Sequence, residues 1–260
     1  MNRFALLLSV VSILLSSFVT YQLVQSNKAG LSDQYIKKDD LKIYFDQYVD
    51  QGAETIFAAV VKGVELQKQA DAEKKRMAIL DSKDALENDP TTPYSGNEKA
   101  DVNIVMFSDY LCGYCKKSAP ILAKMLQDDP NLKLIVKEYP VLGQGSMIAA
   151  KAALAAFKID KSKYPAMNMQ LFEKTLGSEK DLLDMASAAG IDGAALLTEM
   201  ATPENNQSIQ QNQALGSKLG INGTPAFIID GVLYPGAMSG EQLAEIVKNI
   251  RASRAAKKEG

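Results

Sequence analysis

The residues with the clearest potential for chemistry are two cysteines, Cys112 and Cys115, separated by Gly113 and Tyr114. The 260-residue chain contains no other cysteine and no histidine. A disulfide between residues so close in sequence closes a very short loop and therefore stabilises a fold little. The pair is instead typical of reversible thiol chemistry, in which one thiolate attacks a disulfide and a neighbouring thiol resolves the product.

The same composition argues against other kinds of site. A structural zinc ion needs four ligands, usually Cys or His, and this chain offers two. A Cys–His hydrolase needs a histidine. The net charge of −2 does not favour a nucleic-acid partner, and the basic run at residues 248–258 is typical of a solvated helix end. We therefore expect no metal and no separate cofactor: the redox group is the Cys112–Cys115 disulfide itself.

The first 24 residues have the pattern of an export segment. Arg3 precedes an apolar run over residues 4–19 that continues to about residue 24. A basic start followed by such a run is typical of a secretory signal. About 20 apolar residues are also long enough for an uncleaved membrane anchor. We expect residues 1–24 to be a signal peptide or an N-terminal anchor, with the cleaved signal favoured.

Helical periodicity without proline extends over residues 31–88. Gly52 is expected to divide this segment into two helices. Their apolar stripes must be covered, either by self-association or by packing on the main domain as a hairpin. Self-association is favoured, so residues 25–90 are predicted to form a helical oligomerisation region.

The cysteine pair lies between two predicted strands. A turn-rich linker over residues 89–97 precedes a strand at 102–107, and the pair then opens a helix in which Pro120 is expected to introduce a kink. A second strand follows at 132–139. Strand, helix and strand in this order predict a parallel pair with the cysteines at the carboxyl end of the first strand.

Helices are predicted from about 146 to 219, with Ser146 as the cap of the first. Two strands follow at 226–230 and 232–234, with Asp230-Gly231 as the hairpin turn, and the final helix carries a capping box at its start. This order of elements predicts an α/β, thioredoxin-like fold with a helical insertion. Residues 91–260 are predicted to be the catalytic domain, and 146–219 the insertion.

The predicted position of Cys112 favours its thiolate. Unpaired N–H groups and the helix dipole stabilise an anion at the start of a helix, and a lowered pKa makes a thiol reactive. Cys115 lies about one turn further in and is expected to be less exposed.

Several side chains near the pair have two interpretations. Asp109, Lys137 and Glu138 follow or end the predicted strands, and a buried carboxylate there could carry a proton for Cys115. The favoured alternative is a capping or surface charge. Tyr110 and Tyr114 could form an apolar rim that contacts unfolded chains. For Tyr110, packing in the protein core is an equally favoured alternative.

Three stretches carry a resemblance to a known family: FSDYLCGYCKKSAP, IVKEYPVLGQGS and NGTPAF, spread over residues 95–250. In these stretches the chain resembles the DsbA family of exported thiol:disulfide oxidoreductases. The resemblance implies that the fold is thioredoxin-like and that Cys112 and Cys115 are the catalytic residues. It also implies substrates among unfolded or misfolded exported proteins with cysteines, and a membrane redox partner that reoxidises or reduces the pair.

The resemblance further implies the substrate-binding residues. In the family, the pair corresponding to Thr224 and Pro225 contains a cis proline beside the disulfide. Pro225 is therefore expected to be cis, and Thr224 to offer backbone groups to an extended substrate, with Gly113 and Tyr114 beside them. Thr224 is more like the isomerases of the family, so the sequence leaves oxidation and isomerisation both open.

The helical prefix is similar in arrangement to the ScsC-like and outer-membrane-antigen branch of the family, whose members form dimers or trimers. The resemblance implies a homo-oligomer in the periplasm or cell envelope. An alternative from another class is a non-catalytic envelope antigen or scaffold whose cysteine pair is structural or vestigial.

Overall fold

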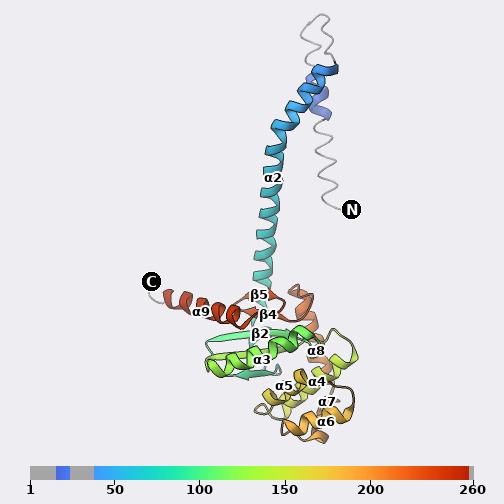
Figure 1. The fold of residues 1–260 in the computed structure, drawn as a ribbon, viewed down its shortest axis with the longest axis vertical. Coiled ribbons are helices and arrows are strands. Elements are labelled where there is room, and N and C mark those ends of the chain that lie inside the picture. Colours follow the sequence, from blue (N-terminus) through green and yellow to red (C-terminus); the bar gives the residue numbers. More distant parts are fainter. Residues whose placement is uncertain (1–15, 24–37, 258–260) are drawn as a thin grey trace, which may run out of the picture. The chain divides into compact units, whose positions relative to one another are not determined.

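The computed structural model describes residues 16–23 and 38–257 (Figure 1). The chain divides into two compact units, Met1–Gln67 and Lys68–Gly260. The predicted signal or anchor at residues 1–24 lies outside the described residues except for 16–23, which are helical. Within the described ranges, no helix is both long and apolar enough to cross a bilayer. The predicted boundary at residue 90 stays a prediction.

Helix α2 (Lys38–Asp81) is continuous, so the predicted break at Gly52 is wrong. A single glycine inside a helix costs only about 1 kcal/mol relative to alanine, and the remaining 43 residues sustain the helix. In the first unit, α2 carries many exposed apolar side chains. They are Ile43, Tyr44, Phe45, Val49, Ile56, Phe57, Val60, Val61, Val64 and Leu66.

The second unit is built on a five-stranded sheet in the order β1-β3-β2-β4-β5. Its strands are β1 (Tyr94–Gly96), β2 (Val102–Ser108), β3 (Leu132–Glu138), β4 (Ala226–Ile229) and β5 (Val232–Pro235). β2 and β3 are parallel, as predicted, and the other neighbours are antiparallel. Strand β1 corrects the prediction of a linker over residues 89–97. Three residues are too few to show a period of two, and only pairing with β3 makes them a strand.

Both faces of the sheet are covered, because alternate residues of β2 and β3 enter two different cores. Ile104 and Met106 pack on one face with α3 (Gly113–Asp128), the insertion and α9 (Gly240–Ala256). Val105 and Phe107 pack on the other face with Ile79 from the end of α2, the short π-helix η1 (Asp84–Asn88) and the end of α8 (Pro203–Lys218). Burying each such side chain contributes roughly 1.5–3 kcal/mol.

Five helices form the insertion between β3 and β4 (Figure 1). They are α4 (Gln144–Ile159), α5 (Tyr164–Glu173), α6 (Glu179–Ala188), α7 (Gly193–Met200) and α8 (Pro203–Lys218). Alanine-rich α4 is buried along most of its length, which lets its neighbours approach closely. Helix α7 lies inside the predicted helical insertion but was not delimited there, because eight residues are too few for a clear helical period.

The predicted hairpin turn and the predicted capping box of the last helix are both confirmed. Asp230 and Gly231 both have positive φ, as a two-residue hairpin turn between antiparallel strands requires. Ser239 and Gln242 form the predicted capping box of α9. Helix α3 runs from Gly113 to Asp128 without interruption at Pro120.

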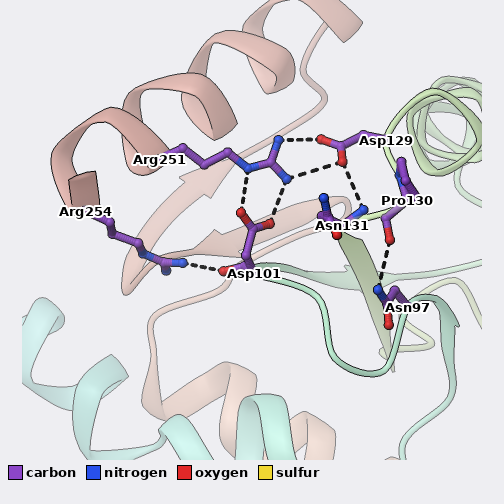
Figure 2. A network of polar contacts seen from close by, with 7 residues as sticks. All are labelled: Asn97, Asp101, Asp129, Pro130, Asn131, Arg251 and Arg254. Atoms are coloured by element: carbon purple, nitrogen blue, oxygen red, sulfur yellow. Dashed lines mark hydrogen bonds and ion pairs between the residues drawn. The ribbon is translucent and has the colours of Figure 1, made fainter. Parts of the chain in front are cut away.

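Arg251 of α9 ties together the start of β2 and the end of α3 (Figure 2). Its guanidinium donates to both carboxylate oxygens of Asp101 at 2.7 Å each. It also donates to both oxygens of Asp129, at 2.6 and 3.3 Å. Arg254 donates to the Asp101 carbonyl oxygen. This clamp holds the carboxyl end of the helix that carries the cysteines.

Candidate active site

The cysteine pair lies where β2 passes into α3. β2 ends at Ser108, and the backbone N–H of Cys112 donates to the Asp109 carbonyl oxygen at 3.1 Å, which closes a tight turn. Cys112 is the N-cap residue of α3, with extended backbone angles (φ −71°, ψ 120°). Cys115 follows in the first turn. Both are free thiols; Cys112 is 9% exposed, whereas Cys115 is 0% exposed. Of the two, only Cys112 retains some exposure to solvent.

The segment before β4 lies against Cys112. Its sulfur donates a hydrogen bond to the carbonyl oxygen of Thr224 at 3.3 Å. The Thr224–Pro225 peptide bond is cis, which confirms the expectation for Pro225. Pairing of β4 with β2, in which Ala226 faces Phe107, brings this segment to the cysteines across 112 residues of sequence.

The pKa values of the two cysteines are shifted in opposite directions. Burial opposes ionisation of Cys112, but hydrogen bonds from the Thr224 side chain and from the backbone of Cys115 and Tyr114 outweigh it, and its pKa lies below that of an ordinary cysteine. Burial raises the pKa of Cys115 to about 12, with a further increase from the charge of Cys112. The structure therefore has one thiol that readily ionises and one that keeps its proton.

Tyr110 and Tyr114, the two tyrosines near the cysteine pair, differ in burial. Tyr114 is 63% exposed between the cysteines, whereas Tyr110 is 1% exposed and packs against Phe172 with the two rings tilted by 43° and their centroids 4.4 Å apart. Of the two alternatives for Tyr110, core packing is confirmed. Tyr114 and Gly113 are both exposed next to Cys112.

Asp109, Lys137 and Glu138 are all buried, at 1%, 1% and 0% exposure, so the interpretation of any of them as a surface charge is wrong. Strand alternation sends Lys137 and Glu138 to opposite faces of β3. Lys137 donates to Thr92 at 2.6 Å and pairs with Asp89 at 3.5 Å, which ties the segment before β1 to the sheet. Burial lowers the pKa of Lys137, and Asp89 partly restores it.

Glu138 lies in a buried polar group on the α3 side. The Tyr110 hydroxyl is 3.1 Å from Glu138 Oε1 and 2.8 Å from Asn168 Oδ1. One hydroxyl hydrogen cannot serve two acceptors; a protonated Glu138 that donates to Tyr110 satisfies both contacts. Burial, with the nearby charge of Asp109, raises the pKa of Glu138 well above its usual value. Sequence reasoning missed Asn168, which lies 58 residues from Tyr110 and belongs to no local motif.

The Asp109 side chain accepts hydrogen bonds from backbone N–H groups, as a capping residue does, but these groups belong to loops and not to the first turn of a helix. Its carboxylate accepts hydrogen bonds from the backbone N–H groups of Leu111 (2.8 Å), Val141 (2.7 Å) and Leu142 (3.0 Å). It also accepts one from the Ser146 hydroxyl at 2.7 Å. Ser146 is therefore not the predicted helix cap: α4 begins at Gln144, and the buried serine points to Asp109 instead.

Comparison with known proteins supports the thioredoxin-like fold and a relationship to thiol-disulfide oxidoreductases. A thioredoxin family model matches residues 87–249. The chain is 39% identical to a thioredoxin-like oxidoreductase from Silicibacter pomeroyi DSS-3, over 65% of this chain and 97% of that one (TM-score 0.60). It is 33% identical to the thiol-disulfide exchange protein alpha-DsbA2 from Wolbachia pipientis, over 70% and 98% (TM-score 0.65). A linker-deletion mutant of Proteus mirabilis ScsC is 27% identical, over 86% and 99% (TM-score 0.68).

Curated proteins match at lower identity. The chain is 24% identical over 167 residues to the Na⁺/H⁺ antiporter NhaA 3 of Salinispora tropica, but spans only 26% of that protein. It is 25% identical over 179 residues to Disulfide bond formation protein D of Bacillus subtilis, covering 64% of this chain and 81% of that protein. With a family model that covers more than half of the sequence, the chain belongs to the thioredoxin-like family, among the DsbA- and ScsC-like thiol-disulfide oxidoreductases.

Proposed function

We propose that this protein is an exported enzyme that forms or isomerises disulfide bonds in other proteins through Cys112 and Cys115. The observation that carries the proposal is the asymmetry of the pair. Cys112 is partly exposed at the start of α3, and its pKa is lowered. The Cys115 sulfur is fully buried, with its pKa raised to about 12. Such a pair has a nucleophile and a resolving thiol, and it needs no further cofactor.

In the oxidising direction, a substrate thiolate attacks Cys112 of the Cys112–Cys115 disulfide. A mixed disulfide forms between substrate and Cys112, and Cys115 leaves and takes up a proton. A second substrate thiolate then attacks the substrate sulfur of the mixed disulfide and expels the Cys112 thiolate. The substrate loses two electrons, and the cysteine pair gains them. The lowered pKa of Cys112 favours this direction, because it makes Cys112 a good leaving group.

In the isomerising direction, the Cys112 thiolate of the reduced pair attacks a substrate disulfide and is expelled later by another substrate thiol. Electrons are only rearranged within the substrate. Both directions need an extended substrate segment beside Cys112, and we assign its binding to Gly113, Tyr114, Thr224 and Pro225. Their proximity to Cys112 supports this assignment.

We further propose that the protein works as a homo-oligomer, a dimer or a trimer, in the periplasm or cell envelope. The exposed apolar side chains of α2 in the first unit support self-association, because burying them stabilises an assembly. The export segment at residues 1–24 supports the location. A membrane protein that reoxidises or reduces the pair completes the cycle.

The test uses Cys112→Ser and Cys115→Ser variants. The oxidised wild-type protein should introduce disulfides into a reduced, unfolded substrate with several cysteines. Cys112→Ser should lose this activity at least a hundredfold. Cys115→Ser, mixed instead with a substrate that contains disulfides, should accumulate a mixed disulfide between Cys112 and the substrate, visible on a non-reducing gel, because no second thiol resolves it. Circular dichroism checks that both variants are folded. Full activity of Cys112→Ser would contradict the mechanism and favour the antigen or scaffold alternative.

The direction is tested on a scrambled substrate with wrongly paired disulfides. Glutamate in place of Ile56 and Phe57, both exposed on α2, should give monomers by light scattering. If self-association serves isomerisation, these monomers keep oxidase activity and lose isomerase activity. Substitution is preferable to deletion of residues 31–88, because Ile79 and Leu86 within that segment are buried in the core.

A further inference from the structure

Asp109 is a buried carboxylate that joins two loops beside the reactive cysteine. It is 1% exposed, and all four partners of its oxygens are hydrogen-bond donors. Oδ1 accepts from Leu111 and Ser146, and Oδ2 accepts from Val141 and Leu142. Its own carbonyl oxygen also accepts from the N–H of Cys112. One residue therefore sets the backbone of both the cysteine turn and the loop after β3.

The residues that Asp109 holds carry exposed apolar side chains. Leu111 is 41% exposed, Val141 50% and Leu142 54%. Leu111 immediately precedes Cys112, and Val141 and Leu142 are bonded to the same carboxylate. These three side chains, whose backbone N–H groups meet at the Asp109 carboxylate, are called the apolar lip below. Gly145 makes room for it, since a Cβ there would lie 3.1 Å from Leu111 Cδ2.

Exposed apolar side chains on two separate loops would usually pack together or shift with their loops. Here the backbone of each loop is fixed by charge-assisted bonds to a buried group. A preformed apolar surface binds a flexible chain with less loss of conformational freedom than a surface that must be assembled on binding. Continuity with the partly exposed Cys112 identifies the occupant: an apolar side chain next to the cysteine of an unfolded polypeptide.

We propose that Asp109 is a positioning residue, which presents the apolar lip to substrate segments that have apolar residues beside their cysteine. The proposal rests on the proposed function, since it assigns a preference to the same thiol–disulfide exchange. Asp109 does not touch the reacting sulfurs through its carboxylate. It acts through Leu111, Val141 and Leu142.

The experiment compares two short peptides that each contain one cysteine. One has phenylalanine and leucine on either side of it, and the other has glycine and serine. The protein is mixed with each reduced peptide and with glutathione disulfide, which reoxidises the cysteine pair after each turnover. The value of kcat/KM for oxidation of the peptide thiol is measured after the uncatalysed rate has been subtracted. The quantity compared between variants is the ratio of kcat/KM for the apolar peptide to kcat/KM for the glycine–serine peptide. A change in the acidity of Cys112 affects both peptides equally and cancels in this ratio.

Asp109→Asn should lower the ratio about tenfold, mainly through a higher KM for the apolar peptide. The amide places an N–H group against backbone donors, so at least one loop loses its anchor. Val141→Ser combined with Leu142→Ser should give a similar loss, and adding Asp109→Asn to that pair should cause little further change. Asp160→Asn is the matched control: its carboxylate accepts from Ser162 N–H and Oγ on a remote, exposed turn, and the ratio should not change.

An unchanged ratio in Asp109→Asn would overturn the proposal, as would an equal loss for both peptides. If Asp109→Asn does not fold, Ser146→Ala decides the matter, because it removes one donor and leaves the carboxylate in place. It should lower the ratio measurably, and an unchanged ratio again overturns the proposal. If the wild-type protein oxidises neither peptide, the proposed function fails, which is a different result from a constant ratio.

Discussion

The clamp at Arg251 allows the contribution of one side chain to be predicted from its contacts. The guanidinium makes four hydrogen bonds, two to Asp101 and two to Asp129, and joins α9 to the start of β2 and the end of α3 (Figure 2). Its side chain is 34% exposed, so solvent screens the charges in part. Exposed ion pairs contribute about 0–1 kcal/mol, and hydrogen bonds to charged groups about 1.5–3 kcal/mol each when they are buried. Because the Arg251 side chain is only partly exposed, we expect a contribution between these two limits.

We therefore expect Arg251→Ala to lower the free energy of unfolding by about 1–2 kcal/mol. Arg251→Lys should lose roughly half as much, because one ammonium group cannot bind two carboxylates at once. The measurement is urea unfolding followed by circular dichroism at neutral pH and fixed protein concentration. Lys124→Ala is the control: it removes an ion pair with Asp128 near the same end of α3, but Lys124 is 73% exposed, so its loss should stay below about 0.5 kcal/mol.

The clamp also predicts a pH dependence. Hydrogen bonds to Arg251 hold the pKa values of Asp101 and Asp129 below the ordinary 3.8. A lowered carboxyl pKa contributes stability above pH 3.8, and this contribution is lost as the pH falls through the folded-state values. Wild-type protein and Arg251→Ala should therefore converge in stability in strong acid. A difference that persists there, or equal losses for Arg251→Ala and Lys124→Ala, would refute the reasoning.

Three further predictions concern the core and the cysteines. Iodoacetamide should modify Cys112 with a midpoint below the ordinary pKa of 9.0 and leave Cys115 unmodified below about pH 12; equal rates would contradict the assigned acidities. Gly216→Ala should destabilise the fold by about 1–3 kcal/mol in urea unfolding, since its Cβ would lie 2.5 Å from Tyr139 Cε2. Glu138→Gln should gain stability over wild type as the pH rises above 4.5, because burial keeps the folded carboxyl protonated while the unfolded one ionises. A constant difference between these two proteins across that range would contradict the raised pKa of Glu138.

The clamp variant should leave the chemistry of Cys112 unchanged. Asp129 follows the last residue of α3, whereas Cys112 precedes the first, and a helix of 16 residues is about 24 Å long. Alkylation of Cys112 in Arg251→Ala should match wild type under native conditions. This result would separate the contribution of the clamp to stability from the reactivity of the site.

Features that depend on neighbouring residues were predictable from the sequence. The cysteine spacing, the order of strand and helix around it, the hairpin turn at Asp230-Gly231 and the capping box at Ser239 all depend on interactions within a few residues. The order of elements then predicts the parallel pairing of β2 and β3, because a short crossover through a helix allows little else. The cis state of Pro225 was implied only by family resemblance, since the trans form is the default for an X–Pro bond.

Tertiary structure decided the features in which distant segments meet. Pairing with β3 makes a strand of Tyr94–Gly96, which local sequence presents as a linker. Packing on both faces of β3 buries Lys137 and Glu138, two residues that by type alone belong at the surface. Asp109 and Asn168 find their partners 32 to 58 residues away. The sequence by itself determined which residues can react, because thiol chemistry is a property of the side chains and their spacing. Only the fold decided their acidities and neighbours, because burial and hydrogen bonding depend on which segments it brings together.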